Sequence, residues 1–204
     1  LEPLQIAALR FALASACVIV WLLIKRERLI PKSKDLFHIV LGAFVGILLY
    51  FFFENYGLKY TTAGNGALIT ATIPVINTLV DTIIYKKSLP VIKWTGVIVS
   101  ILGVYLIVST GEGGLSLSSS MMKGNLLVLG AAFSWVLYNV VNKPILEIYT
   151  PTELSAYQMI VGFVFLAPFG LFDKINWGGS PALTGFNLVY LGFFCSFVAY
   201  VLYL

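Results

Sequence analysis

Seven long apolar segments, separated by short polar loops, dominate the sequence and constrain what the chain can fold into. An α-helix rises about 1.5 Å per residue, so about 20 apolar residues are needed to cross about 30 Å of hydrocarbon. Of the residues, 59% are hydrophobic and only 11% are charged, whereas soluble domains are about 25% charged. The sequence therefore predicts an all-α fold, a polytopic membrane helix bundle with seven transmembrane helices. Hydropathy and helix breakers place them near residues 4–24, 36–57, 65–85, 91–109, 123–143, 152–172 and 184–204.

The basic residues lie in short loops rather than along one face, which argues for a membrane topology and against a nucleic-acid partner, despite a net charge of +4. By the positive-inside rule, we expect the lysine- and arginine-rich loops 25–35, 86–91 and 143–151 to be cytoplasmic. In the last of these loops, Thr150-Pro151-Thr152-Glu153 has the pattern of a capping box with proline at the first helical position. This pattern predicts a sharp helix start there.

The motifs of several other classes of protein do not occur in the sequence. There is no GxxxxGK[ST] phosphate loop, no His/Glu metal motif and no nucleophile elbow. Cys17 and Cys195 both lie inside apolar segments without metal-ligand spacing, so we interpret them as packing residues. We therefore expect no metal, no cofactor and no enzymatic activity.

Two parts of the chain resemble one another in the same order. The segment Pro3 to Phe11 aligns with Pro151 to Met159, and Leu41 to Gly46 with Tyr50 aligns with Leu191 to Ser196 with Tyr200. The charge pattern orients the first member of each pair opposite to the second, which indicates an inverted repeat. Chance similarity between apolar segments, which align easily, is the alternative.

An inverted repeat requires an odd number of helices in each unit, and the spacing of the matched segments leaves room for five. We predict a first repeat at 1–110, a linker at 111–122 and an incomplete second repeat at 123–204. On this alignment the first repeat lacks its opening helix and the second lacks its last two, so we expect a piece of a longer protein.

An ordered series of short motifs carries a resemblance to a known family. They are Ala8-Leu9-Arg10-Phe11, Tyr56 to Asn65, Leu68 to Pro74, Trp94-Thr95-Gly96, Ile101-Leu102-Gly103-Val104 and Ala131 to Trp135 with Tyr138-Asn139. In these the chain resembles the ten-helix, EamA-type branch of the drug/metabolite transporter superfamily, over nearly its whole length. The resemblance implies a bacterial or archaeal plasma-membrane protein that carries small organic metabolites, such as amino acids, through a central cavity by alternating access. Many relatives have a glutamate where this chain has Lys86-Lys87. No role of that glutamate is therefore assigned to this chain.

Polar residues inside apolar helices mark the faces that turn away from lipid, where unsatisfied polar groups are costly. Thr70, Pro74 and Asn77 share one such face. Pro74 removes a backbone donor and leaves the Thr70 carbonyl open, so the face is either a cargo contact or a packing kink with hydroxyls bonded to their own backbone. Trp135, Tyr138 and Asn139 share another face, which combines flat apolar area with hydrogen-bonding tips, as in small-molecule pockets.

Three further positions complete the predicted set of cargo-binding residues. Tyr50 and Tyr200 are equivalent in the two repeats, and each follows a pair of small residues that we interpret as helix-packing positions. The long side chain of Arg10 either snorkels toward the membrane surface, pairs with a carboxylate or binds an anionic cargo. Its repeat partner Gln158 is neutral, which favours the interpretation of Arg10 as a structural anchor. Glu54 and Asp81 lie near helix ends, where they bind a coupling proton or are simply solvated.

The predicted function is a secondary transporter of small organic metabolites, an exporter by resemblance. Its partners are the small-molecule cargo and the lipid bilayer, with a homodimer as an open alternative to a single chain. Two rival functions are a non-transporting seven-helix receptor or scaffold, and a membrane-embedded lipid-modifying enzyme. The inverted repeat disfavours the first, and the scatter of ionisable groups over different helix ends disfavours the second.

Overall fold

The computed structural model describes residues 2–86, 90–110, 120–171, 180–199 and 202, which form helices and their connections with no strand among them. Within these residues, six helical segments are long and apolar enough to cross a membrane, and a shorter apolar helix lies at Val91–Gly103. The predicted polytopic helix bundle is therefore confirmed. The six segments are Leu4–Lys25, Ser33–Tyr60, Ala63–Ile84, Ser120–Asn142, Pro151–Gly170 and Pro181–Val198.

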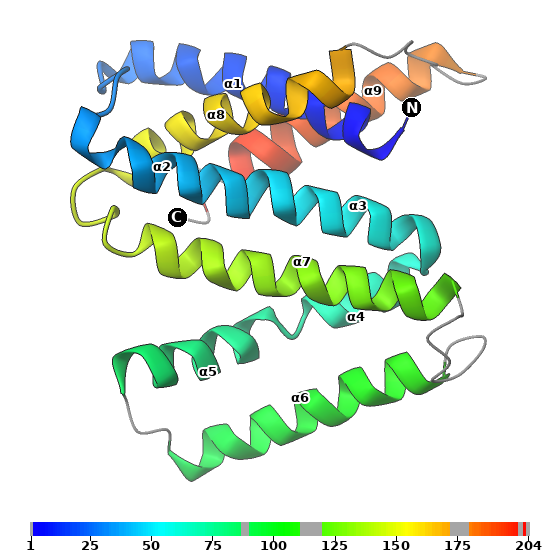
Figure 1. Ribbon diagram of the computed structural model, residues 1–204. Coiled ribbons are helices and arrows are strands. Elements are labelled where there is room, and N and C mark those ends of the chain that lie inside the picture. The colour runs from blue at the N-terminus through cyan, green and yellow to red at the C-terminus, as the bar shows by residue number, and fades with distance from the viewer. Residues whose placement is uncertain (1, 87–89, 111–119, 172–179, 200–201, 203–204) are drawn as a thin grey trace. The chain divides into compact units, whose positions relative to one another are not determined.

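The elements follow one another along the chain in two compact units, which we call unit 1 (Leu1–Leu48 with Val140–Leu204) and unit 2 (Leu49–Asn139). Two of the elements, η2 and η3, are short π-helical turns that continue the α-helix before them. The elements are α1 (Pro3–Lys25), η1 (Ser33–Asp35), α2 (Leu36–Ala43), η2 (Phe44–Leu49), α3 (Tyr50–Tyr60), α4 (Ala63–Thr70), α5 (Ile73–Tyr85), α6 (Val91–Thr110), α7 (Ser120–Asn142), α8 (Pro151–Leu171), α9 (Pro181–Gly192) and η3 (Phe193–Val198) (Figure 1).

In unit 1, α1 and α8 pack side by side in opposite directions (Figure 1). Near the start of α8, Glu153 accepts a hydrogen bond of 3.3 Å from the backbone N–H of Arg28, which lies just beyond the end of α1. Near the end of α8, Gly170 lies so close to Ala8 that a Cβ atom at position 170 would overlap the Ala8 methyl group. These two helices, which the sequence alignment pairs, are thus antiparallel, as an inverted repeat requires.

The face of α1 that is buried recurs every three or four residues, as expected for one face of an α-helix. Four of its members are alanine or valine, and such small side chains let neighbouring helix backbones approach closely in a membrane. All are at most 1% exposed: Ala7, Ala8, Phe11, Ala14, Val18 and Leu22.

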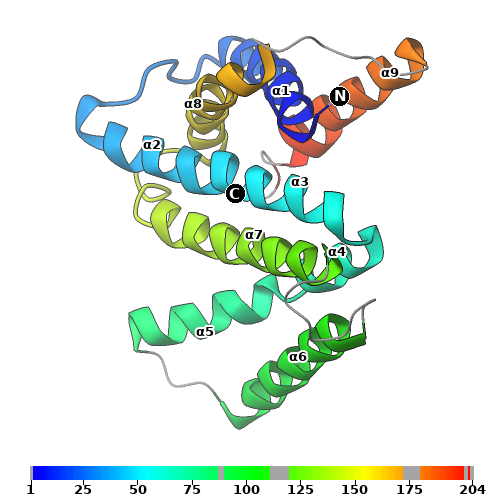
Figure 2. The same ribbon diagram turned by 45° about the vertical axis from the view of Figure 1, so that its right-hand side comes forward.

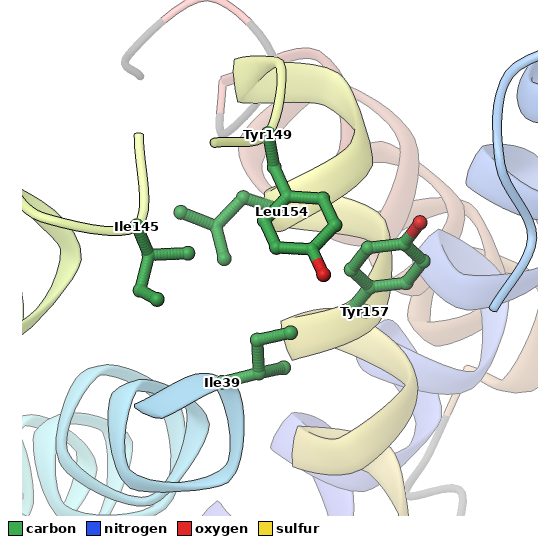
Figure 3. Close-up of a cluster of buried hydrophobic side chains, with 5 residues drawn as sticks. All are labelled: Ile39, Ile145, Tyr149, Leu154 and Tyr157. Carbon is green, nitrogen blue, oxygen red and sulfur yellow. The ribbon is translucent and has the colours of Figure 1, made fainter. Parts of the chain in front are cut away.

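A cluster of buried side chains joins α2, α8 and the connection between α7 and α8. Figure 3 shows its members pointing toward one another: Ile39, Ile145, Tyr149, Leu154 and Tyr157. The hydroxyl of Tyr149 accepts a hydrogen bond of 2.9 Å from the backbone N–H of Lys32, and that of Tyr157 donates one of 2.7 Å to the backbone carbonyl of Arg28. Loops 25–35 and 143–151 therefore lie at the same end of unit 1, which agrees with the expectation that they share one side of the membrane.

The predicted start of α8 is confirmed in detail. The backbone N–H of Glu153 donates to the Thr150 hydroxyl at 3.2 Å, and the backbone N–H of Thr150 donates to the Glu153 carboxylate at 3.1 Å. These reciprocal bonds make a capping box, with Pro151 as the first helical residue.

In unit 2, α3 packs closely on α7 through two glycines. A Cβ atom at Gly57 would lie 2.6 Å from Cγ2 of Val128, and one at Gly124 would lie 2.6 Å from the backbone nitrogen of Thr61. Any side chain at either position would push the two helices apart. At the same contact, the hydroxyl of Thr61 donates a 2.5 Å hydrogen bond to the side-chain carbonyl of Asn125.

The membrane span predicted at 65–85 is present as Ala63–Ile84, but the chain forms two helices there. The first, α4, ends at Thr70, and α5 begins at Ile73 with Pro74 in its first turn (Figures 1 and 2). Proline lacks a backbone N–H and its ring clashes with the preceding turn of an α-helix, so it favours a helix start and kinks or breaks a helix when it lies in the interior. The kink expected at Pro74 is therefore a break in the helix.

Candidate functional site

Three aromatic side chains of the predicted set lie together in unit 2. The ring of Trp135 lies 4.9 Å, centroid to centroid, from the ring of Tyr50 and 5.1 Å from that of Tyr138. Trp135 and Tyr138 are three residues apart on α7 and so project from the same face, whereas Tyr50 comes from the first position of α3. Tyr138 is fully buried, and the other two side chains are half-buried. We call these three residues the aromatic cluster.

A carboxylate adjoins the aromatic cluster. The hydroxyl of Tyr50 donates a hydrogen bond of 2.7 Å to Oε1 of Glu54, which lies one helical turn further along α3. Glu54 is half-buried. Sequence reasoning considered Glu54 only as a helix-end or proton-binding group and left it out of the cargo site. The spacing of four residues from Tyr50 was the signal that joins the two side chains.

An amide pair connects α7 to α5. The side-chain Nδ2 of Asn139 donates a hydrogen bond of 3.2 Å to Oδ1 of Asn77, and both residues are half-buried. Asn139 is four residues from Trp135 and next to Tyr138, so the amide pair adjoins the aromatic cluster on the same face of α7. Each amide has two donors and an acceptor carbonyl, and together they suit a carboxylate, amide or hydroxyl group.

The hydroxyl groups around the break between α4 and α5 bond to their own backbone. Thr70 donates to the carbonyls of Gly66 and Ala67, each at 3.0 Å, and Thr72 donates to the carbonyl of Ile69 at 2.7 Å. For the Thr70 hydroxyl, the structure matches the packing alternative. Pro74 is exposed, and its carbonyl accepts a hydrogen bond of 2.8 Å from the hydroxyl of Thr78. Among the residues that the structure describes, no hydrogen bond or ring contact joins Thr70 or Pro74 to the aromatic cluster.

Arg10 belongs to unit 1, where it contacts the π-helical turn η3. Its Nε donates a hydrogen bond of 2.9 Å to the hydroxyl of Ser196, and Nη2 donates one of 3.4 Å to the carbonyl of Cys195. A π-helical turn shifts the backbone hydrogen bonds of a helix, and such turns often occur at functional sites. These contacts match the interpretation of Arg10 as an anchor. Tyr200 lies outside the described residues.

The repeat partners Arg10 and Gln158 have related surroundings in unit 1. Gly192 of α9 lies against Leu13 and the backbone carbonyl of Arg10, while Gly42 of α2 lies against the amide of Gln158. The sequence alignment pairs these two glycines, and each comes just before one of the two π-helical turns. Each glycine thus packs on the helix of the other repeat that carries Arg10 or Gln158, against the backbone carbonyl of Arg10 in one case and the side-chain amide of Gln158 in the other.

The sequence profile of the EamA-like transporter family matches two ranges of the chain, residues 1–109 and 122–204. The chain belongs to the EamA-like transporter family. This result confirms the resemblance, and the chain is that of an integral membrane transporter with apolar helices of membrane-spanning length.

Individual transporters align over nearly the whole chain. An uncharacterised transporter of Archaeoglobus fulgidus is 34% identical over 209 residues, which cover 100% of this chain and 70% of the relative. The uncharacterised transporter YyaM of Bacillus subtilis is 28% identical and covers 98% of this chain and 67% of its own length. A solved crystal structure superposes with a TM-score of 0.71 at 20% identity, covering 98% of this chain and 68% of that one, and shows that the fold is shared.

The aromatic cluster and its polar neighbours bring together aromatic faces, one carboxylate and two amides. Among the described residues, no group of three or more His, Cys, Asp and Glu side chains is placed to hold a metal ion. Aromatic faces bind apolar groups and cations, and a carboxylate binds an ammonium group. The site is therefore suited to recognising an amphipathic organic molecule.

Proposed function

We propose that this EamA-family protein is a secondary transporter that exports small organic metabolites, amino acids among them. The observation that carries the proposal is the aromatic cluster of Tyr50, Trp135 and Tyr138 with the Glu54 carboxylate beside it, on helices of membrane-spanning length. A carboxylate inside such a helix is costly in lipid and usually faces a cavity or a partner.

The arrangement of polar groups matches the two ends of an amino acid. The Glu54 carboxylate and the faces of Tyr50 and Trp135 would take the ammonium group, as carboxylates and aromatic rings do for organic cations. The amides of Asn77 and Asn139 would donate to the carboxylate. The remaining aromatic area would accept an apolar side chain.

A relative supports both the cargo class and the direction. A protein of Streptantibioticus cattleyicolor named "Probable terminal-alkyne amino-acid exporter" is 28% identical over 171 residues, 84% of this chain and 56% of the relative. Its name combines an amino-acid cargo with export, and we extend both to this chain.

The proposed mechanism is alternating access between two inverted repeats, residues 1–110 and 123–204. The antiparallel packing of α1 and α8 and the matched contacts of Gly42 and Gly192 support the repeats. The break between α4 and α5 supports a cargo path near it, because discontinuous helices commonly form transporter sites. Loops 25–35, 86–91 and 143–151 would then face the cytoplasm of a bacterial or archaeal cell.

Counterflow tests the proposal directly. The full-length protein is reconstituted in liposomes that are loaded with one amino acid, and uptake of the same labelled amino acid is measured. We expect accelerated exchange for at least one member of an amino-acid panel and its loss in W135A. The control W94A alters an exposed tryptophan of α6 outside the aromatic cluster and should keep exchange. Absence of exchange for every compound, or equal loss in W94A and W135A, would count against the proposal.

A further inference from the structure

Unit 2 contains an apolar cavity of about 590 Å³ bounded by α5, α6 and α7. Its walls include Leu79 and Ile83 from α5, Ile101 and Tyr105 from α6, and Leu129 and Phe133 from α7. Nine of its twelve lining residues have hydrocarbon side chains, and the other three are Thr72, Ser100 and Tyr105. The hydroxyl of Thr72 donates to the backbone carbonyl of Ile69 at 2.7 Å, so that group adds little polarity. The cavity is therefore a place for hydrocarbon and not for a polar cargo.

A second cavity, of about 550 Å³, adjoins the first and has a different character. It is lined by Tyr60 from α3 and by Ser120, Lys123, Leu126 and Leu127 from α7. Leu126 lines both cavities, so they are neighbours along α7. The second cavity offers two hydroxyl groups and one ammonium group, and the side chain of Lys123 is exposed.

The residues that α7 contributes to the two cavities form one stripe. Leu126, Leu129 and Phe133 are separated by three, four or seven residues and so share one face of the helix, and Lys123 lies one turn before Leu126 at the edge of that face. Ser120 lies further round the helix, where it lines the second cavity. From Lys123 to Phe133 the helix rises about 15 Å, at about 1.5 Å per residue. This length equals half of the roughly 30 Å hydrocarbon core, which is the depth of one leaflet. The stripe changes from cationic to apolar in the direction in which a phospholipid changes from headgroup to acyl chain.

We propose that this groove of α5, α6 and α7 binds one anionic phospholipid. One acyl chain fills the apolar cavity, and the phosphate is held by Lys123 with the hydroxyls of Tyr60 and Ser120. Charge complementarity selects the occupant: an ammonium group at the end of an apolar groove matches an anionic headgroup, and α7 is long and apolar enough to lie in a bilayer. The groove is lined by residues other than those of the aromatic cluster. The proposal therefore does not depend on which cargo is transported.

Photolabelling tests the proposal on the full-length protein. The protein is placed in phosphatidylcholine nanodiscs that contain a trace of phosphatidylglycerol with a diazirine on its acyl chain, and adducts are located by mass spectrometry. We expect adducts on the parts of α6 and α7 that line the groove, with far fewer when the same diazirine is carried by phosphatidylcholine. K123Q should lower the phosphatidylglycerol adducts about five-fold, the effect of one interfacial lysine, and leave the phosphatidylcholine adducts unchanged.

Two further variants separate the groove from general effects of charge and folding. K59Q removes a lysine of α3 that lines neither cavity and should keep the wild-type labelling. L129W keeps Lys123 and fills the groove, so it should abolish labelling there while the protein still elutes as a single species. Three results would each overturn the proposal. They are equal labelling by the two lipids, an equal loss in K59Q and K123Q, and no adduct in the groove because another part of the full-length protein covers it.

Discussion

The hydroxyl of Tyr50 and the carboxylate of Glu54 are joined by a hydrogen bond of 2.7 Å along one turn of α3. The same Tyr50 ring lies 4.9 Å from the ring of Trp135, so one side chain links the carboxylate to the aromatic cluster. The phenol thus holds the carboxylate in place and contributes an aromatic face at the same time.

The first prediction concerns this link. Y50F keeps the ring and removes the hydrogen bond that helps to hold the Glu54 carboxylate in its position. A hydrogen bond to a charged group contributes about 1.5–3 kcal/mol, so we expect the KM for an amine-bearing cargo to rise by about ten-fold or more, since about 1.4 kcal/mol corresponds to ten-fold. The control is Y56F, because Tyr56 stacks on Phe52 of α3 and lies outside the aromatic cluster. Equal KM values in Y50F and Y56F would show that the bond has no part in binding.

Arg10 provides a test that separates an anchor from a cargo ligand. Its guanidinium donates to Ser196 and to the carbonyl of Cys195, so R10M removes both bonds to η3. As an anchor, Arg10 should stabilise the protein by about 1.5–3 kcal/mol and leave the KM of the folded transporter nearly unchanged. Thermal unfolding in detergent and counterflow kinetics measure the two quantities. A ten-fold rise in KM with unchanged unfolding would identify a ligand instead.

The S196A variant gives the matching half of a double-mutant cycle. If Arg10 acts through Ser196, the destabilisation of R10M and S196A together should be smaller than the sum of the two single effects. Additive effects would mean that the contact of 2.9 Å contributes little.

The sequence predicted the elements of the fold better than their internal detail. Hydropathy located every described membrane helix, and the residue types at Thr150 and Glu153 predicted the capping box that is observed. Pro74 indicated a kink in the helix at 65–85, but hydropathy, which is the same on both sides of the break, did not show that the chain forms two separate helices there. The sequence patterns also gave no sign of the π-helical turns η2 and η3.

The candidate site shows a similar division. Helical spacing placed Trp135 and Tyr138 on one face, which the structure confirms. The pairing of Asn139 with Asn77 joins residues on two different helices, so it required the tertiary fold. The Thr70 hydroxyl was open to two interpretations because a threonine in an apolar helix bonds either to its own backbone or to a neighbour, and only its rotamer decides.

Close packing at Gly42 leads to a prediction about stability. A Cβ atom there would overlap the amide of Gln158, which is fully buried and donates a hydrogen bond of 2.6 Å to Asn142. G42A should therefore destabilise the protein by about 1–3 kcal/mol, the usual effect of overpacking. The control is G185A, since nothing lies within 4 Å of a Cβ atom at position 185. G185A should be neutral or slightly stabilising, because alanine is favoured over glycine in a helix by about 0.5–1 kcal/mol. Thermal unfolding of the two variants in the same detergent measures the difference.

The last prediction concerns alkaline pH and Tyr149, which lies in the connection between α7 and α8. Burial raises the pKa of Tyr149 above its ordinary value of 10.0, and a hydrogen bond to Asp35 and the charge of that carboxylate raise it further, while the backbone N–H of Lys32 and the charge of Arg28 lower it. The Tyr149 hydroxyl donates a hydrogen bond of 2.8 Å to Asp35, and the residue is only 3% exposed. The fold therefore favours the neutral phenol of Tyr149 over its ionised form.

The sign of the pH effect follows from this shift. In the unfolded chain Tyr149 ionises near its ordinary pKa of 10.0, and in the folded protein it ionises only at higher pH. The stabilisation is therefore complete below about pH 10 and is lost as the pH rises through the folded pKa.

Y149F removes the bond to Asp35 and should lower the free energy of unfolding by about 2 kcal/mol at neutral pH. The gap between wild type and Y149F should then narrow above about pH 10. Unfolding curves recorded from neutral to alkaline pH measure this gap, with Y190F, which alters an exposed tyrosine of α9, as the control. A gap that stays constant or widens at alkaline pH would show that Tyr149 is not held neutral by Asp35 and burial.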